Sequence, residues 1–98
     1  MDLETHCRDC LNRLGKEYRE VNIFIDQFFA KMGPSHRSVY HCVEGLVEIK
    51  EKFGNEGVEA ANVHILRDFE GDFDYIPTKL DVEKWYANIY EGVGDWPL

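Results

Sequence analysis

The sequence contains few cysteines and no long apolar run. Its three cysteines, Cys7, Cys10 and Cys42, are an odd number in a chain that begins without a secretion signal. That combination argues against a disulfide framework and favours free thiols in the cytoplasm. No stretch approaches the about 18 to 20 consecutive apolar residues that a membrane-spanning helix requires. We therefore expect a protein that neither crosses a membrane nor is exported.

Basic residues are also scarce. The chain has 11 Lys and Arg against 19 Asp and Glu, which gives a formal net charge of −8. Residues 1–54 hold nine acids and eight bases, whereas residues 55–98 hold ten acids and three bases. Because negative charge repels phosphate backbones and anionic lipid surfaces, direct binding to nucleic acid or to a membrane is disfavoured.

The composition is that of a folded chain. Hydrophobic residues make up 44% of the sequence and aromatic residues 13%, which is too much for a disordered acidic tail. A length of 98 residues suits one hydrophobic core. We expect a single domain over residues 1–98.

Apolar residues recur at intervals of three and four over residues 3–32, the spacing of a helical stripe. Gly15 favours a break or kink there, so that one long helix and two joined helices both remain open. The apolar face around Phe24, Phe28 and Phe29 is wide for a small bundle. A homodimer is one way in which the apolar surface that a single bundle leaves exposed could be covered.

A second helix is predicted over residues 36–53. Gly33 suits the left-handed position after a helix, Pro34 cannot continue one, and Ser35 has a side chain that caps the next. Gly54 then provides the stop at the far end.

Two further helices complete the prediction. After a turn at residues 55–57, apolar spacing predicts a third helix over residues 58–69. Thr78 precedes Asp81 by three residues, which resembles a capping box and predicts a last helix over residues 79–91. The side chains that this helix is expected to bury are Leu80, Trp85 and Ile89.

The expected fold is therefore all-α, a small bundle of four to five helices with an acidic aromatic connector before the last helix. In this connector, residues 68–75, acids alternate with aromatics, and such a surface offers a basic partner both contact area and electrostatic steering. The expected function is that of a non-enzymatic interaction domain that binds a basic protein surface, for example a phage-type inhibitor or nucleic-acid mimic. The predicted partner-binding residues are Asp68, Glu70, Asp72, Phe73, Asp74, Tyr75 and Trp96.

Histidines and one aspartate suggest a second function. His64 and Asp68 are four residues apart on one predicted helix, so that a carboxylate can orient the imidazole. His36 and His41 are five apart, about 140° around a helix, which predicts that only one of them, His36, joins the pair. This set forms either a buried polar network or a site for a divalent metal, as in a metal-binding domain or a metal-dependent hydrolase.

Two metal-site patterns are incomplete in this sequence. The order of the histidines is similar to that in phosphohydrolases of the HD superfamily, but His64 is followed by Ile65 in place of the adjacent aspartate. Cys7 and Cys10 have the CxxC spacing of zinc ligands, yet no second paired motif accompanies them. We expect these cysteines to pack in the core as small hydrophobes.

The middle of the chain resembles a family of short uncharacterised proteins from bacteria and their phages, over residues 34–85. The family has paired histidines where this sequence has His41 and Cys42. The resemblance implies that the His and Asp positions are a shared feature of the family, without implying an activity. The residues that carry it are an HR-x3-H block at His36, Arg37 and His41, an H-[IV]-x-x-D block at His64, Ile65 and Asp68, and an I-P-[ST] step at Ile76, Pro77 and Thr78.

Overall fold

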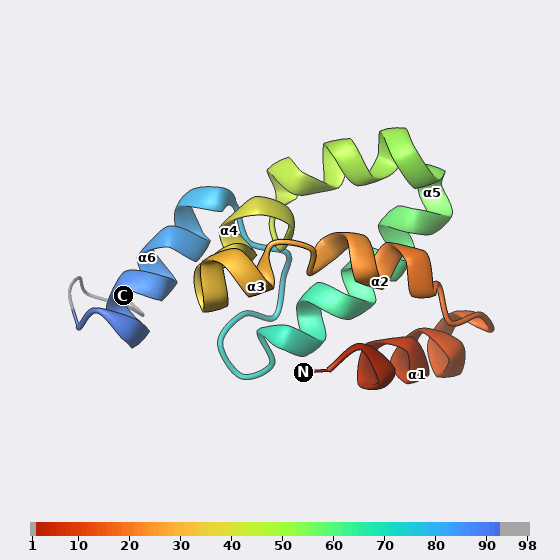
Figure 1. Ribbon diagram of the computed structural model, residues 1–98, viewed down its shortest axis with the longest axis horizontal. Helices are drawn as coiled ribbons and strands as arrows, with labels where there is room; N and C mark the ends of the chain where they lie inside the picture. The colour runs from red at the N-terminus through yellow and green to blue at the C-terminus, as the bar shows by residue number, and fades with distance from the viewer. Residues whose placement is uncertain (1, 93–98) are drawn as a thin grey trace.

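The computed structural model describes residues 2–92 and confirms the all-α prediction. Helices account for 76% of the described residues, which include no strand. None of the helices in that part of the chain has both the length and the apolar character needed to cross a membrane. In Figure 1 the helices form a small bundle with one arm at the C-terminal end.

The N-terminal third is broken into short helices. α1 (Leu3–Leu14) begins where the side chain of Asp2 accepts a hydrogen bond from the backbone of Thr5, and it ends at Gly15, whose φ of 84° is left-handed. α2 (Arg19–Ile25) and the single turn α3 (Phe29–Met32) follow. Of the two alternatives left open for this segment, the broken one is therefore found.

The helix predicted over residues 36–53 is wrong at its start. The chain forms a 3₁₀ turn, η1 (Gly33–His36), then α4 (Arg37–Tyr40), and only after His41 and an extended Cys42 does α5 (Val43–Asp68) begin. Ser35 caps no helix here, because its hydroxyl donates to the carbonyl of Met32.

The close packing of α4 and α5 explains this break. A Cβ added to Gly45 would lie 2.6 Å from Cα of Tyr40, so only glycine lets the first turn of α5 come this close. The backbone N–H of Val43 bonds outside its own helix, to the carbonyl of Pro77 over 2.8 Å. The chain therefore turns at residues 41–42 instead of continuing as one helix.

The expected break at Gly54 is confirmed, but the turn expected at residues 55–57 is helical. Gly54 has a φ of 75° and divides α5 into two helical halves. Figure 1 shows the halves as a V, with the second half running back toward α4. This reversal brings the end of α5 back toward the segment from which the helix started.

The last helix, α6 (Lys79–Tyr90), begins as predicted. Thr78 and Asp81 form the reciprocal capping box, and the backbone N–H of Lys79 donates to the side chain of Glu44 over 2.8 Å. Of the three side chains expected to be buried, only Trp85 is, at 4% exposure. The other two, Leu80 at 58% and Ile89 at 50%, face solvent, because α6 makes most of its helix contacts with α4 and η1 and turns these two side chains away from them.

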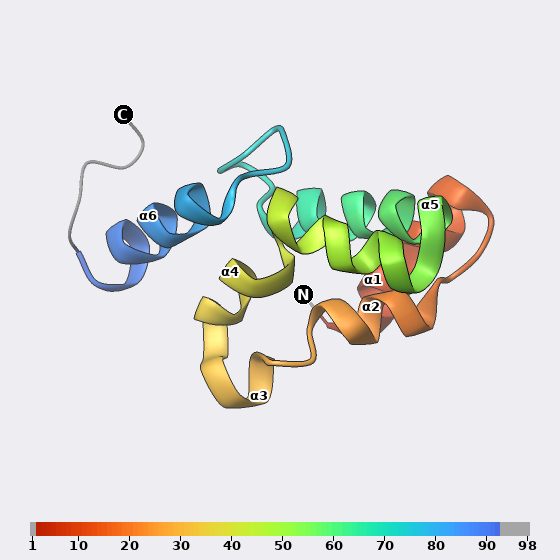
Figure 2. The same ribbon diagram turned by 90° about the horizontal axis from the view of Figure 1, so that it is seen from above.

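One core joins these elements. α1 and α2 pack against α5, and Figure 2 shows α3, α4 and α6 together at the other end of the molecule. Phe24 and Phe28 pack against Tyr40 within the chain, so that of the predicted dimer face only Phe29 is largely exposed, at 55%. The large apolar side chains that are fully buried are Phe69, Ile25, Ile49, Ile65 and Val82, and Trp85, Phe73 and Tyr40 are nearly so.

Candidate metal centre

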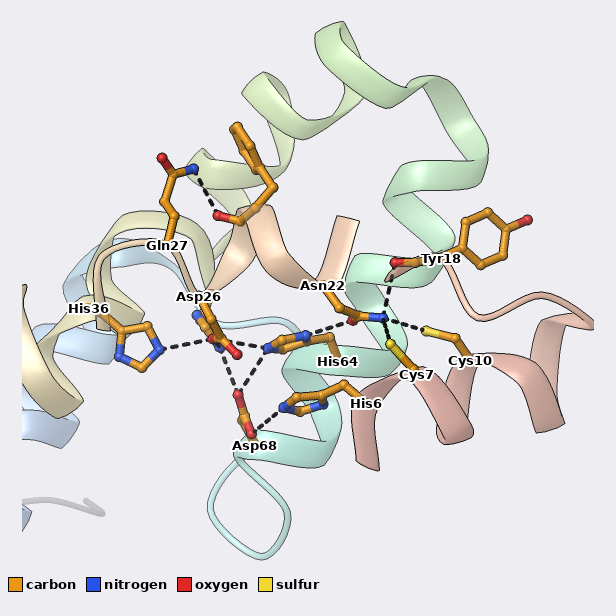
Figure 3. Close-up of polar contacts among 12 residues, drawn as sticks. His6, Cys7, Cys10, Tyr18, Asn22, Asp26, Gln27, His36, His64 and Asp68 are labelled. Carbon is orange, nitrogen blue, oxygen red and sulfur yellow. Dashed lines mark hydrogen bonds and ion pairs between the residues drawn. The ribbon is translucent and has the colours of Figure 1, made fainter. Parts of the chain in front are cut away.

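All four histidines of the chain converge on two aspartates in the interior. They come from α1, from η1, from the residue that ends α4 and from the second half of α5, while one aspartate follows α2 and the other ends α5. Figure 3 shows five of these side chains pointing toward one another. The six residues, named below as the His/Asp cluster, are His6, Asp26, His36, His41, His64 and Asp68.

His64 is oriented by Asn22. The side-chain amide of Asn22 donates to the backbone carbonyls of Glu17 and Tyr18, both over 3.1 Å, so its oxygen is free to accept. That oxygen lies 2.8 Å from Nδ1 of His64, which therefore carries the proton (Figure 3). In the neutral ring the lone pair of Nε2 then faces both carboxylates of the cluster, an arrangement typical of metal-bound histidine.

Asp26 collects three imidazoles. Its Oδ1 lies 3.0 Å from Nε2 of His36, 3.4 Å from Nε2 of His41 and 3.3 Å from Nε2 of His64. Nδ1 of His36 lies 2.7 Å from the carbonyl of Gly33, so this ring also has its proton on Nδ1 and its Nε2 toward a carboxylate. The side chain of Asp26 is 28% exposed, which makes it the member of the cluster nearest to solvent.

Asp68 uses both of its oxygens and is only 3% exposed. Oδ2 lies 2.8 Å from Nε2 of His41 and 3.2 Å from Nε2 of His64, while Oδ1 lies 3.1 Å from Nε2 of His6. The rings of His6 and His64 are stacked, with their centroids 3.5 Å apart and their planes within 9°. Asp68 thus lies between two parallel imidazoles that face different oxygens.

The cluster favours ionised carboxylates and a neutral His41. Burial lowers the pKa of His41 to about 3, in spite of its hydrogen bond to Asp68. Burial also disfavours the charged forms of Asp26 and Asp68, but hydrogen bonds from His36 and His64 to Asp26, and from His41 to Asp68, outweigh it and hold the pKa of both carboxyls well below the ordinary range. These are the protonation states in which such groups bind metals.

His64 differs from His41. Burial lowers its pKa, but the hydrogen bonds to Asp26 and Asp68 outweigh burial, and the net shift is upward. Without a metal, a proton on Nε2 of His64 therefore occupies the space between the two carboxylates. Any metal ion at this place replaces that proton, because both need the same lone pair.

The distances suit a single ion. One donor atom from each of Asp26, His41, His64 and Asp68 lies within 4.8 Å of the others. Two atoms that are each about 2.1 Å from one ion are about 3.0 to 3.4 Å apart when their angle at the ion is between 90° and tetrahedral. The four nitrogen-to-oxygen distances in this group are 2.8, 3.2, 3.3 and 3.4 Å. The group therefore has the composition and nearly the spacing of a four-ligand N/O site.

The prediction that His36 and His41 cannot point to the same place is wrong. Both contact Oδ1 of Asp26, and their rings are 4.9 Å apart. The angle of about 140° applies to residues on one continuous helix, whereas here η1 passes into α4 and the helix then ends at His41. The three residues expected to lie together, His36, His64 and Asp68, are all in the His/Asp cluster.

Sequence reasoning missed Asp26, His6 and Asn22. Asp26 directly follows α2, in a stretch whose apolar spacing drew attention to its neighbours. His6 lies on α1 beside Cys7, in a segment whose apolar spacing predicts a helix and no site. The available signal was that these polar side chains fall among buried positions, since buried polar groups require partners.

The acidic connector divides between interior and surface. Asp68 belongs to the His/Asp cluster and Phe73 is buried at 5% exposure, so neither is available to a partner as expected. Asp72 is exposed and accepts a hydrogen bond from the indole of Trp85 over 3.0 Å. Glu70, Asp74 and Tyr75 are exposed, and Trp96 lies outside the described residues.

The cysteines are separate from the cluster. Cys7, Cys10 and Cys42 are free thiols, as expected; all three are buried, and none of them belongs to the group of residues spaced to hold a metal. Burial raises the pKa of each thiol.

Comparisons of the chain with protein-family models, with curated proteins and with solved structures found no match.

Proposed function

We propose that this chain is a metal-binding domain that holds a divalent transition-metal ion on Asp26, His41, His64 and Asp68. The observation that supports this most directly is the orientation of His64. Its Nδ1–H is fixed by Asn22, so that its Nε2 faces two carboxylates at 3.2 and 3.3 Å. Three electron-rich atoms this close together in the interior need a positive charge between them, which a proton on Nε2 supplies in the metal-free chain and a bound metal ion supplies in its place.

The donor set indicates the class of metal. Two imidazole nitrogens and two carboxylate oxygens suit zinc, iron or manganese better than calcium, which takes oxygen ligands alone. A divalent ion also balances the two negative charges of Asp26 and Asp68. Since four protein ligands fill a tetrahedral shell, the ion stabilises the fold at the point where α2, α4 and α5 meet.

Zinc binding by the full chain tests this proposal. After dialysis against a chelator has removed bound metal, the wild type is expected to bind added Zn²⁺ and to gain about 2.7 kcal/mol of unfolding free energy when free metal is about 100 times the dissociation constant. His64→Gln and His41→Gln are expected to lose this gain. Asp74→Asn, on the exposed connector, is the matched control and should behave as the wild type. A wild type that neither binds added Zn²⁺ nor becomes more stable with it contradicts the proposal.

The exposed part of the acidic connector supports a second function, binding of a protein with a basic surface. Glu70, Asp74 and Tyr75 all face solvent in the loop between α5 and α6, where charge can steer a partner and an aromatic ring can be buried on contact. This function does not depend on the metal centre, because none of these three side chains belongs to it.

Charge reversal tests the second function. The wild type is expected to retain a basic protein from lysate at low salt and to release it at high salt, and Glu70→Lys with Asp74→Lys should abolish retention. Glu56→Lys with Glu83→Lys makes the same charge change at exposed positions on α5 and α6. Equal retention by the two double variants, or no retained protein with the wild type, would count against a specific acidic surface.

A further inference from the structure

The His/Asp cluster has more donors than one ion requires. Four of its six residues make up the proposed first site, and His6 and His36 remain. The contact between Nε2 of His36 and Oδ1 of Asp26, over 3.0 Å, has the geometry of a hydrogen bond. The contact of His6 with Asp68 does not have this geometry.

His6 is fully buried on α1. Neither of its ring nitrogens makes a hydrogen bond to any of the residues that the structure describes. Its Nε2 is nevertheless only 3.1 Å from Oδ1 of Asp68 (Figure 3). A close nitrogen-to-oxygen contact without the direction of a hydrogen bond is what two ligands of one ion show, because each donor atom then points at the ion and not at the other donor.

The stacking of His6 on His64 sets the spacing. Their rings are parallel, with centroids 3.5 Å apart, and their Nε2 atoms face Oδ1 and Oδ2 of the same carboxylate. If one ion lies in the plane of the His6 ring and a second ion lies in the plane of the His64 ring, the distance between the ions is about the distance between the rings. Two-metal sites have separations of about 3.5 to 4 Å and are commonly bridged by a carboxylate.

We propose that the centre takes a second divalent ion, held by Nε2 of His6 and Oδ1 of Asp68, so that Asp68 bridges two metals. This inference rests on the proposed function, because the first ion occupies Oδ2 of the same carboxylate. The second ion has two protein ligands, and its other positions are filled by water. It therefore binds more weakly than the first ion and keeps positions at which an oxygen ligand can exchange.

The experiment counts ions and detects their coupling in the full chain. Metal-free protein is dialysed against increasing Mn²⁺, and bound metal is measured together with the electron paramagnetic resonance spectrum. The wild type is expected to bind two ions per chain in two steps, the second at least about 10-fold weaker, with the spectrum of an exchange-coupled pair at saturation. His6→Phe, which keeps a ring against His64 but has no donor, is expected to bind one ion and show no coupling.

Each outcome separates the two proposals. Saturation of the wild type at one ion overturns the second site and leaves the first in place, whereas no bound ion overturns both. Two coupled ions in His6→Phe would overturn the role of His6. Asn12→Leu, an exposed change on the same helix, is the control and should still bind two. Should His6→Phe fold poorly, His6→Gln serves in its place, and the wild-type count decides independently of either variant.

Discussion

Asn22 and His64, on different helices, are joined by a 2.8 Å hydrogen bond between the side-chain oxygen and Nδ1. The amide nitrogen of the same asparagine donates to two backbone carbonyls and lies 3.9 and 3.6 Å from the sulfurs of Cys7 and Cys10. One buried side chain thus links the buried cysteines of α1 to the His/Asp cluster. Its role is to hold the imidazole in the tautomer that turns Nε2 toward the carboxylates.

Replacing Asn22 should therefore weaken metal binding without removing a ligand. Asn22→Leu keeps the approximate volume but cannot accept the proton of His64, and loss of such a supporting contact typically costs about 10- to 100-fold in affinity. Competition with a zinc chelator of known affinity measures the change. Asn12→Leu is the same substitution at an exposed position and should leave the affinity unchanged. Equal affinities for both variants would show that Asn22 does not orient the ligand.

Asp68 should be important even in the metal-free chain. Asp68→Asn removes a buried charge that three histidines contact, and breaking such a network costs about 3 to 5 kcal/mol. Urea unfolding in the presence of a chelator gives the free energy of unfolding. Asp74→Asn removes an exposed charge and should change it by no more than about 0.5 kcal/mol. A small effect of Asp68→Asn would mean that the histidines are satisfied without this carboxylate.

The stability of the metal-free chain should fall on the acid side of about pH 6.5. His41 has a pKa of about 3 in the folded chain, below the ordinary value of about 6.5 that it has when unfolded. The stability from its burial is therefore fully present above pH 6.5 and is lost as the pH falls, by up to about 1.4 kcal/mol per pH unit. The depressed carboxyls add nothing between about pH 6.5 and 5, since they stay ionised even when unfolded.

Above about pH 6.5, the stability of the metal-free chain should fall as the pH rises. The raised pKa of His64 gives stability that is present below about pH 6.5 and is lost as the pH rises through the folded value. Urea midpoints with chelator present should therefore be highest near pH 6.5, and His41→Gln should flatten the loss between pH 6.5 and 5. A wild type equally stable at about pH 5 and 6.5 would contradict a neutral, buried His41.

Gly45 should prove essential for the break between α4 and α5. Gly45→Ala places a Cβ against the backbone of Tyr40, and such overpacking costs about 1 to 3 kcal/mol. Thermal unfolding should show the loss, and Zn²⁺ affinity should fall with it because His41 lies in the same turn. Lys50→Ala, on an exposed face of α5, is the comparison. Unchanged stability in Gly45→Ala would show that the two helices can move apart.

Local signals in the sequence determined several of the helix boundaries. Gly15 and Gly54 break the chain because glycine adopts positive φ without strain, and Thr78 with Asp81 caps α6 whatever the rest of the chain does. The burial of Cys7 and Cys10 also followed from apolar spacing. These properties depend on neighbours within about four residues along the chain, which the sequence displays directly.

The tertiary structure alone decided which polar side chains meet. His6 and Asp68 are 62 positions apart in the sequence (68 minus 6), and they meet because α1 packs against the returning half of α5. His36 and His41 meet because the helix stops between α4 and α5, which removes the fixed rotation that a continuous helix imposes. That stop depends on contacts with Tyr40 and with Pro77, more than thirty residues away from Val43, and no local pattern in the sequence encodes them.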